Sequence, residues 1–503
     1  MDLLSTKSKG AAAVDGWTRK MLKSRVTPRI LTAFCNLWLC SGRVPSRITE
    51  GRTTLIPKIA GTMDPGQFRP ITVGSTLLRL YHGILGKRIE LQLPISQRQK
   101  GFRKGDEIFF NSLLLQKCIR KAKTEIKNLS MAFLDMRKAF DSVGHGAIWA
   151  ACRRLGVPRH LIEYFSRFYA MSSTRLVLGD RLSDKITSKR GIKQGDPVSV
   201  HLFNAVIDLC TSRMNHQIGF KLDADSVLSY MAFADDLVIV SETKEGLEVN
   251  VELLMQGLKK AGFAANPAKS ATLNIVARSG KWLCDERSVL KIDGNDIPGI
   301  GVKDTYRYLG VDVGVGQEGS NPKRMLTTYL EKLTRAPLKP QQRMYLLRNY
   351  LLPKVYHQLV MLQPRAKTLN TLDFLVRSEV KKWMKVKVQC PSSFIYSDVK
   401  DGGLGVPSLR YLIPRLRHQR LCRLTGSEDT LAPLIYNLED LAAPVVAGKT
   451  VSSKEDIRNI WKEKLADSVD GKGLLQHQVM VSTLRWKSIT SCTMMFYHFL
   501  RVC

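Results

Sequence analysis

The chain has 503 residues, which is long enough for more than one domain and for a sizeable core. Its 78 Lys and Arg residues outnumber its 44 Asp and Glu residues, and the net charge is +34. An excess of this size, spread from end to end, favours a polyanion such as nucleic acid as the partner. The alternative is a basic protein that binds no nucleic acid.

Several classes of protein are excluded by what the sequence lacks. No basic start precedes an apolar run, so no signal peptide is expected, and no stretch of about 18 apolar residues predicts a membrane span. The ten cysteines are scattered and include no Cys-x-x-Cys pair. They are typical of reduced thiols in an intracellular protein and speak against a structural zinc site.

In chain order, residues 1–50 are predicted to be helical with a break at "SGRVPS". Extended segments are expected in "RTTLIPKIAG" and at "FRPITV", followed by apolar periodicity typical of helices. Strands are predicted at "LSMAFLD", in a hairpin within 173–196, as strand–turn–strand over 226–242, and at "KSATLNIV" and "RYLGVDV". Helices are expected within 76–93, 107–125, 145–170, 197–215 and 244–266, and from about 320 onward.

Two of the predicted strands end in carboxylates. "MAFLD" ends at Asp135, and "YMAFADD" ends at Asp235 and Asp236, whose like charges repel each other and are costly to bury. Adjacent strands of one sheet would bring the three together as oxygen ligands for two divalent cations, with Mg²⁺ the first candidate. A polar hairpin turn is the alternative interpretation of the Asp pair.

The order of "FLDMRKAFD", "RGIKQGDPVSVHLFNAVID", "FADD", "NPAKS" and "YLG" resembles the palm of a reverse transcriptase, in detail that of non-LTR retrotransposons. "AAAVDGW", "TLIPK", "FRPITV" and "RLYHGILGKRI" resemble the clade that inserts into ribosomal RNA genes. The resemblance covers nearly the whole chain. It implies an α+β right-hand polymerase fold with fingers, a palm built on an antiparallel sheet, and a helical thumb.

The resemblance assigns the catalytic centre. It makes Asp135, Asp235 and Asp236 the ligands of two Mg²⁺ ions, with Asp236 coordinating more loosely. Lys269, in "NPAKS", matches a lysine that donates a proton to the departing pyrophosphate, a role that requires its ammonium near the leaving group. The alternative for Lys269 is a solvated loop lysine.

The same resemblance assigns residues that bind the nucleotide. Lys58 and Arg69 match fingers residues that grip the triphosphate, for which Arg offers a bidentate fork. Phe140 matches the aromatic residue that excludes a 2′-hydroxyl by a steric clash, with a plain core Phe as the alternative. Gln194 and Gly195 match the loop that faces the template and the incoming nucleotide, where Gly permits a close backbone approach or an unusual turn. The alternative is a helix N-terminal turn that makes no such contact.

Three further assignments follow from the resemblance. Arg190 has a positioning role in the loop that contains Gln194, and Pro197 suits the first turn of the next helix. Tyr308, Leu309 and Gly310 match the primer-grip hairpin, with ordinary strand core as the alternative. The predicted domains are an N-terminal extension, fingers, palm, thumb and a C-terminal segment, over residues 1–50, 51–127, 128–315, 320–430 and 431–503.

Full-length members of the clade carry zinc fingers and a Myb-like module before the polymerase, and a zinc knuckle and an endonuclease after it. None of these is visible in this sequence, and Cys492 and Cys503 lack the spacing of zinc ligands. The chain is therefore expected to be a piece or a truncated copy of a larger polyprotein, with the endonuclease in the parent element alone.

The sequence thus predicts an RNA-directed DNA polymerase, a nucleotidyltransferase that extends a DNA primer on an RNA template with deoxynucleoside triphosphates. In the parent element the primer would be a nicked chromosomal target, so the action would be nuclear, with no membrane involved. The alternatives are an inactive RNA-binding remnant, a group II intron maturase-like reverse transcriptase, and an unrelated basic structural protein. The oligomeric state is left open.

Overall fold

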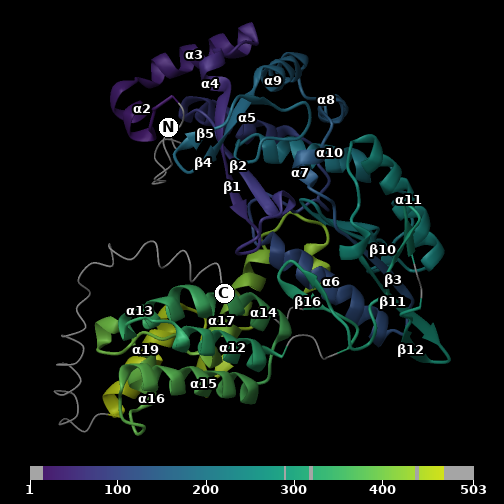
Figure 1. Ribbon diagram of the computed structural model, residues 1–503. Helices are drawn as coiled ribbons and strands as arrows, with labels where there is room; N and C mark the ends of the chain where they lie inside the picture. Colours follow the sequence, from purple (N-terminus) through teal and green to yellow (C-terminus); the bar gives the residue numbers. More distant parts are fainter. Residues whose placement is uncertain (1–14, 288–289, 317–320, 437–440, 469–503) are drawn as a thin grey trace. The chain divides into compact units, whose positions relative to one another are not determined.

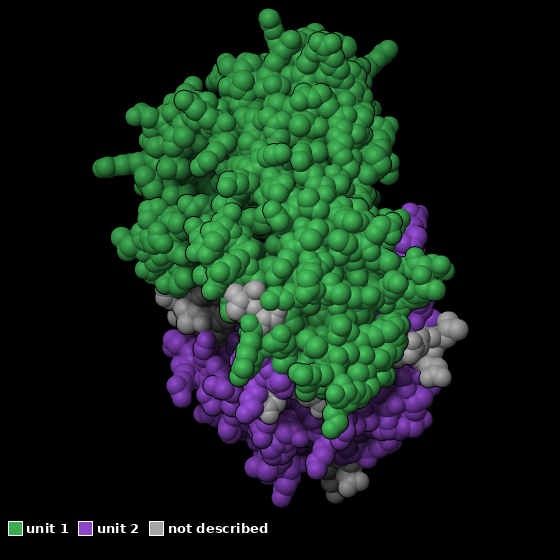
Figure 2. All heavy atoms as spheres, turned by 90° about the vertical axis from the view of Figure 1, so that its right-hand side faces the viewer, with its two compact units in different colours: residues 1–104, 121–300 green, residues 105–120, 301–503 purple. Residues whose placement is uncertain are grey.

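The computed structural model describes residues 15–287, 290–316, 321–436 and 441–468 (Figure 1). The chain divides into two compact units, one of residues 1–104 and 121–300, the other of residues 105–120 and 301–503 (Figure 2). Strands and helices are mixed in the first unit and helices dominate the second. This confirms the predicted α+β class.

One sheet of the first unit carries the segment "TLIPK…FRPITV". Strand β1 (Glu50–Pro57) pairs antiparallel with β2 (Phe68–Val73) and parallel with β4 (Ser173–Leu178). The two short strands β5 (Arg181–Leu182) and β6 (Ile186–Thr187) both pair with β4. The hairpin of β1 and β2 therefore holds Lys58 and Arg69 close to the point where the two strands are joined.

The other sheet is antiparallel throughout, in the order β12-β11-β3-β10-β9. All six residues of its central strand, β3, are buried, because β3 has a paired neighbour on each side and helix α11 packs on it and on β10. This explains why its sequence is continuously apolar rather than alternating. The strands are β3 (Leu129–Leu134), β9 (Tyr230–Phe233), β10 (Asp236–Ser241), β11 (Ala271–Arg278) and β12 (Lys281–Cys284).

Helices of the first unit enclose one hydrophobic core, in which Phe165, Phe203 and Leu254 are almost completely buried. Short hairpins β7–β8 (Phe220–Lys221, Val227–Leu228) and β13–β14 (Leu290–Ile292, Asn295–Ile297) complete the unit. Its helices are α2 (Arg19–Arg25), α3 (Pro28–Ser41), α4 (Ser46–Thr49), η1 (Pro65–Gln67), α5 (Thr76–Gln92), α7 (Ala139–Ser142), α8 (His145–Arg154), α9 (Arg159–Met171), α10 (Ser199–Thr211), α11 (Lys244–Lys260) and η2 (Pro267–Lys269).

The second unit is a helical assembly in which α15 packs against α12 and α17, and α14 packs against α17 and β16. Helix α6 (Glu107–Thr124) supplies its first fourteen residues to this unit. The remaining elements are β15 (Tyr306–Tyr308), β16 (Val311–Val313), α12 (Pro322–Arg335), α13 (Pro340–Leu346), η3 (Leu347–Leu351), α14 (Leu352–Leu362), α15 (Ala366–Met384), α16 (Ser392–Tyr396), η4 (Val399–Asp401), α17 (Leu409–Leu424), α18 (Ala432–Ile435), β17 (Val445–Val446), β18 (Lys449–Thr450) and α19 (Lys454–Asp467).

Details of the sequence prediction require correction. Helix α10 begins at Ser199, so Pro197 lies in the preceding turn and not in the first helical turn. "RYLGVDV" forms two strands joined by a tight turn, because Leu309 and Gly310 both adopt positive φ. The first compact unit ends at residue 300, and strand β16 packs on α14 within the second unit. The limits of fingers, palm and thumb, including the boundary near 315, stay predictions.

Three further expectations concern the whole chain. Within the described ranges, no helix combines the length and the apolar character needed to cross a bilayer. The cysteines that the structure describes are all free thiols. Cys492 and Cys503 lie outside the described residues.

Candidate active site

The two carboxylate-bearing strand ends lie side by side. Strand β10 pairs antiparallel with β3, and Leu237 faces Leu134 in the register. Asp135 directly follows Leu134 and Asp236 directly precedes Leu237, so the two aspartates lie at the same end of this strand pair. Asp235 is the second residue of the two-residue turn between β9 and β10. The residues that flank this turn, Phe233 and Asp236, face each other. The expected adjacency of the two strands is confirmed.

Asp135 is fixed by the segment "NPAKS". The side-chain amide of Asn266 donates to Asp135 Oδ2 at 3.1 Å, and the backbone N–H of Asn266 donates to the Asp135 carbonyl at 2.8 Å. The backbone N–H of Asp135 donates to Ser270 Oγ at 3.2 Å. Lys269, on the short helix η2 between these two contacts, has an exposed side chain. Asn266 and Ser270 thus hold the chain on both sides of Lys269 close to Asp135.

The charges of the aspartates are poorly balanced. Desolvation, followed by the negative charges of Asp235 and Asp135, raises the pKa of Asp236 to about 6, even though its side chain keeps an exposed edge. Desolvation, reinforced by the charge of Asp135, also raises the pKa of Asp235, while the charge of Arg69 opposes this. Such mutual repulsion is what a bound cation would relieve.

The donor atoms of the three aspartates suit a hard cation. In the part of the chain that the structure describes, no three Asp, Glu, His or Cys side chains converge as a ready metal-ligand cluster. Even so, the three aspartates offer only oxygen donors, the kind that hard divalent cations prefer, and their charges act on one another. The residues fit such a cation, and their role as ligands stays a prediction.

Lys58 and Arg69 belong to the hairpin of β1 and β2 and are both exposed. Lys58 Nζ donates to the Gly66 carbonyl at 3.5 Å, and its charge acts on Asp141. Arg69 faces Ile56 in the register and its charge acts on Asp235. The two cations thus lie within electrostatic reach of different carboxylates of the same unit.

The loop "RGIKQGDP" is tied to its surroundings by backbone contacts. Gly195 has φ +114°, and a Cβ at that position would lie 2.4 Å from the Thr72 carbonyl oxygen, so only Gly fits. The Thr72 N–H donates to the Gln194 carbonyl at 2.9 Å, and Gln194 Nε2 donates to Asp141 Oδ1 at 3.2 Å. The predicted close backbone approach at Gly195 is present, and Arg190 in the same loop is exposed.

Phe140 lies on the short helix α7 and is half-buried. Its ring stacks on that of Phe203 with centroids 4.2 Å apart and planes 6° apart, and the Phe102 ring meets it edge-on. The Ile192 N–H donates to the Phe140 carbonyl at 2.7 Å. The side chain is therefore held rigidly, as a steric gate requires, but the same contacts also suit a residue at the margin of the core.

The predicted primer-grip residues lie in the second compact unit. Tyr308 is buried, and Asn111 Nδ2 donates to its hydroxyl at 3.4 Å. Leu309 and Gly310 form the turn between β15 and β16, with φ of +45° and +82°. Tyr308 therefore has a core position within its own unit, and the primer-grip role of the three residues stays a prediction.

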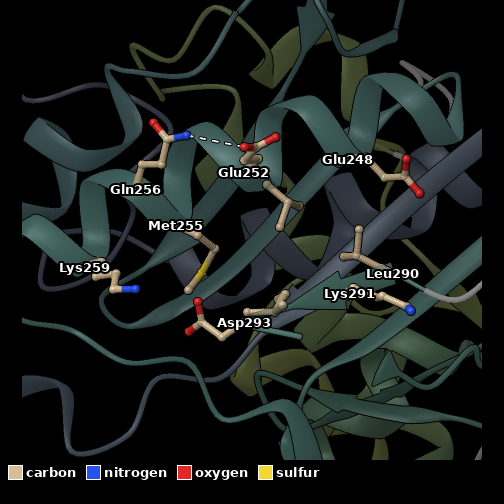
Figure 3. A pocket seen from close by; sticks show the side chains of 10 residues that line it. Glu248, Glu252, Met255, Gln256, Lys259, Leu290, Lys291 and Asp293 are labelled. Atoms are coloured by element: carbon tan, nitrogen blue, oxygen red, sulfur yellow. Dashed lines mark hydrogen bonds between the residues drawn. The ribbon is translucent and has the colours of Figure 1, made fainter. Parts of the chain in front are cut away.

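A hollow of about 550 Å³ lies between α11 and the β13–β14 hairpin (Figure 3). Charged side chains of both signs line it, and Gln256 Nε2 donates to Glu252 at 3.4 Å along α11. None of the predicted site residues is among its lining residues, so the hollow is separate from the centre built around the aspartates.

Sequence reasoning missed several residues that hold the site. Asn266 and Asp141 lie inside motifs that were singled out, yet neither was given a role. Asp196 Oδ2 lies 2.6 Å from His82 Nδ1, and His82 Nε2 lies 2.9 Å from the Tyr164 hydroxyl, in a buried network behind Gln194 and Gly195. The only sequence signal for Asn266, Asp141, Asp196 and His82 was that they lie in the motifs "NPAKS", "FLDMRKAFD", "RGIKQGDP" and "RLYHGILGKRI", respectively.

Comparison with known proteins extends these observations. The chain is 33% identical over 478 residues to the Retrovirus-related Pol polyprotein from type-1 retrotransposable element R2 of Nasonia vitripennis, covering 95% of this chain and 46% of that protein. It is 33% identical over 469 residues to the corresponding R2DM polyprotein of Drosophila melanogaster, covering 92% and 44%. The chain thus spans less than half the length of these two relatives.

A solved telomerase from Candida Tropicalis, in complex with a fragment of telomeric RNA, aligns over 92% of this chain and 68% of its own, with 13% identity and a TM-score of 0.39. The model of the family "Reverse transcriptase (RNA-dependent DNA polymerase)" matches residues 56–313, just over half of the chain. That range includes the three aspartates, Lys58, strand β2 with Arg69, and the loop of Gln194. The chain therefore belongs to the reverse transcriptase (RNA-dependent DNA polymerase) family and has its right-hand polymerase fold.

Proposed function

We propose that this chain is the RNA-directed DNA polymerase part of an R2-like retrotransposon polyprotein. It would extend the 3′-hydroxyl of a DNA primer along an RNA template, using deoxynucleoside triphosphates. The observation that supports this most directly is the pairing of β3 and β10, which brings Asp135 and Asp236 to the same end of two neighbouring strands, with Asp235 in the adjoining turn. Within a reverse transcriptase domain, this is where the chemistry is expected.

Reverse transcriptases are metal-dependent, and we propose Mg²⁺, with two ions held by Asp135, Asp235 and Asp236. When bound, such ions polarise phosphoryl oxygens and lower the pKa of the attacking hydroxyl. The protein's own contribution is to keep these carboxylates fixed and partly desolvated. Asn266 does this for Asp135 through its hydrogen bond to Oδ2.

Other side chains would bind and orient the nucleotide. Arg69 and Lys58 would hold the triphosphate from the hairpin of β1 and β2, where both side chains are exposed. The stacked Phe140 ring would exclude a 2′-hydroxyl, and the backbone at Gln194 and Gly195 would set the position of the base pair. Lys269 would place its ammonium beside the departing pyrophosphate.

The remaining proposals concern the parent polyprotein. Tyr308, Leu309 and Gly310 would hold the primer terminus. The primer would be a nicked chromosomal target, which places the reaction in the nucleus and makes synthesis and insertion one process. Nucleic-acid binding would depend mainly on the +34 charge and would weaken steeply with added salt.

The experiment is primer extension on an RNA template with Mg²⁺ and four deoxynucleotides, comparing the chain with its Asp235→Asn and Asp293→Asn variants. Asp293 is exposed in the β13–β14 turn, far from the site in sequence, and is the matched control. We expect synthesis by the parent and by Asp293→Asn but not by Asp235→Asn, with RNA binding equal in all three. Synthesis by Asp235→Asn would refute the assigned centre.

A second candidate is a catalytically inactive RNA-binding remnant. The same assay distinguishes it, because RNA binding without synthesis by the parent chain would favour the remnant. A group II intron maturase-like enzyme would also synthesise DNA, but the similarity to the two R2 polyproteins over more than nine-tenths of the chain favours the retrotransposon.

A further inference from the structure

The turn that carries Asp235 has an unusual backbone. Ala234 and Asp235 are the two central residues between β9 and β10, and Ala234 has φ +55°. Two-residue hairpin turns need positive φ at their first central position, and Gly is the residue that adopts it freely. An alanine at this position stores strain that its surroundings must hold.

One buried side chain, that of Gln99, binds the backbone of Ala234. Gln99 is only 1% exposed. Gln99 Oε1 accepts from the Ala234 N–H at 2.8 Å, and Gln99 Nε2 donates to the Ala234 carbonyl at 3.2 Å. One amide therefore satisfies both backbone polar groups of the strained residue. Gln99 Oε1 also accepts from the Gly101 N–H at 2.9 Å, so the amide is anchored within its own segment.

The segment around Gln99 is itself held against the hairpin. The Lys100 N–H donates to the Ala232 carbonyl at 2.9 Å, and the Ala232 N–H donates to the Arg98 carbonyl at 3.0 Å. A Cβ on Gly101 would lie 2.2 Å from the Ala234 nitrogen, so the two backbones touch there. From α10, Asn204 Nδ2 donates to the Gly101 carbonyl at 2.8 Å. The segment of residues 98–101, which binds the turn, therefore has little freedom to move.

We propose that Gln99 is a positioning residue of the metal centre, because its amide fixes the Ala234 peptide and thereby the direction of the Asp235 and Asp236 carboxylates. The proposal rests on the proposed metal role of these aspartates. Gln99 touches neither aspartate and acts through the turn alone. Loss of its amide would let the turn relax, and both carboxylates would lose their fixed positions relative to Asp135.

The test compares Gln99→Met with a matched control, Asn250→Leu. Asn250 is completely buried on α11 and also makes three hydrogen bonds, to the N–H and carbonyl of Asn215 and to the Ile218 carbonyl. Both substitutions replace an amide by an apolar group of similar size, so both should lower the thermal unfolding midpoint. Only Gln99→Met should weaken binding of Mn²⁺ to the whole chain without nucleic acid, measured by electron paramagnetic resonance.

We expect Gln99→Met to weaken Mn²⁺ binding roughly tenfold, the lower end for residues that orient metal ligands. Its Mg²⁺ requirement in primer extension should rise by a similar factor. Adding Ala234→Gly to Gln99→Met should restore part of the affinity, because Gly adopts positive φ without strain. If Gln99→Met does not fold, Gln99→Asn is the substitute, since its shorter amide cannot reach both groups of Ala234.

Unchanged Mn²⁺ affinity in a folded Gln99 variant would show that Gln99 only stabilises the core, and would overturn the proposal. The proposal would also be overturned if the parent bound no Mn²⁺, or if Asp235→Asn bound Mn²⁺ as tightly as the parent. If Mn²⁺ binding depends on Asp235 and Gln99 while the parent synthesises no DNA, the positioning role of Gln99 is supported and only the polymerase assignment fails.

Discussion

Asp106 and Asp401 in the second unit differ from Asp235 and Asp236 in the first unit in how their charges are balanced. In the second unit, Asp106 accepts two hydrogen bonds from the Arg420 guanidinium, at 2.5 and 2.6 Å, and Asp401 accepts two from Arg458, at 2.8 and 3.0 Å. In the first unit, Asp235 and Asp236 form no ion pair with any residue that the structure describes, and each raises the local negative charge.

The pKa values show the same contrast. The Arg458 guanidinium lowers the pKa of Asp401, whereas desolvation and neighbouring carboxylates raise the pKa of Asp236 to about 6. A carboxylate that is paired with a cation stabilises the folded protein. An unpaired, partly desolvated one costs stability, and such groups concentrate at functional sites. The contrast therefore separates carboxylates that stabilise the fold from carboxylates that we propose bind a metal ion.

The largest expected effect is on activity at Asp235. Asp235→Asn should lower the rate of primer extension by about 10³-fold or more, because a metal ligand supports several kcal/mol of transition-state stabilisation. The same variant should not lose stability, since it removes one of three mutually repelling charges. Single-turnover extension and urea unfolding measure the two quantities. A variant that lost activity and stability together would place Asp235 with the structural carboxylates.

The largest expected effect on stability lies in the second unit. Arg420→Met leaves Asp106 without its partner, and Arg420 and Asp106 side chains are only 16% and 17% exposed. The free energy of unfolding should fall by roughly 3 kcal/mol in urea titrations. Arg423→Met, an exposed position on the same helix, is the control. Adding Asp106→Asn to Arg420→Met should recover part of the loss, and no recovery would show that packing rather than charge is responsible.

The sequence predicted the parts of the site that lie within short segments. Asp135 and Asp235 follow apolar runs long enough to be strands, and the antiparallel pairing of those strands was the simplest way to join them. Gly195 was identified because its segment, "RGIKQGDP", resembles the reverse transcriptase loop that faces the template and the incoming nucleotide. Each of these inferences used only the order of a few neighbouring residues.

What could not be predicted depends on contacts between distant segments. Gln99 reaches Ala234 across 135 residues, and Arg420 reaches Asp106 across 314. An isolated Gln or Arg carries no signal of its partner, because any of many polar groups would satisfy it equally well. The same reason hides Asn266, whose hydrogen bond to Asp135 depends on where β11 pairs with β3.

A cation in the first unit provides a further comparison, now through pH. Lys193 donates to the Thr49 carbonyl at 3.4 Å and lies over the Phe168 ring, and desolvation lowers its pKa to about 8. The unfolded chain then binds more protons than the folded chain between about pH 8 and 10.4, so this group's contribution to stability rises with pH in that window. From pH 7 to 9.5 the parent should gain about 2 kcal/mol relative to Lys193→Met in urea unfolding. A constant difference would mean that Lys193 is well solvated.

The smallest expected effect tests the contrast most directly, because it uses a charge that has no ion-pair partner among the described residues. Without divalent metal at pH 8, Asp236→Asn should raise the free energy of unfolding by about 1 kcal/mol, a value discounted for the exposed edge of the side chain. The folded pKa of Asp236 is about 6 and the unfolded value is near 3.9. The folded parent therefore takes up a proton as pH falls through 6, and the advantage of the variant should vanish by about pH 4.

Adding Mg²⁺ at pH 8 should remove the advantage in a different way, since the ion stabilises the folded parent more than the variant. Asp293→Asn, at an exposed turn, is the control, and Mg²⁺ should stabilise it as much as the parent. If Asp236→Asn instead destabilised the metal-free chain, Asp236 would have an unrecognised partner, and the distinction between balanced and unbalanced carboxylates would not hold at this site. If Mg²⁺ stabilised parent and variant equally, the repulsion between the aspartates would still be supported, but the ion would bind at a site that does not include Asp236.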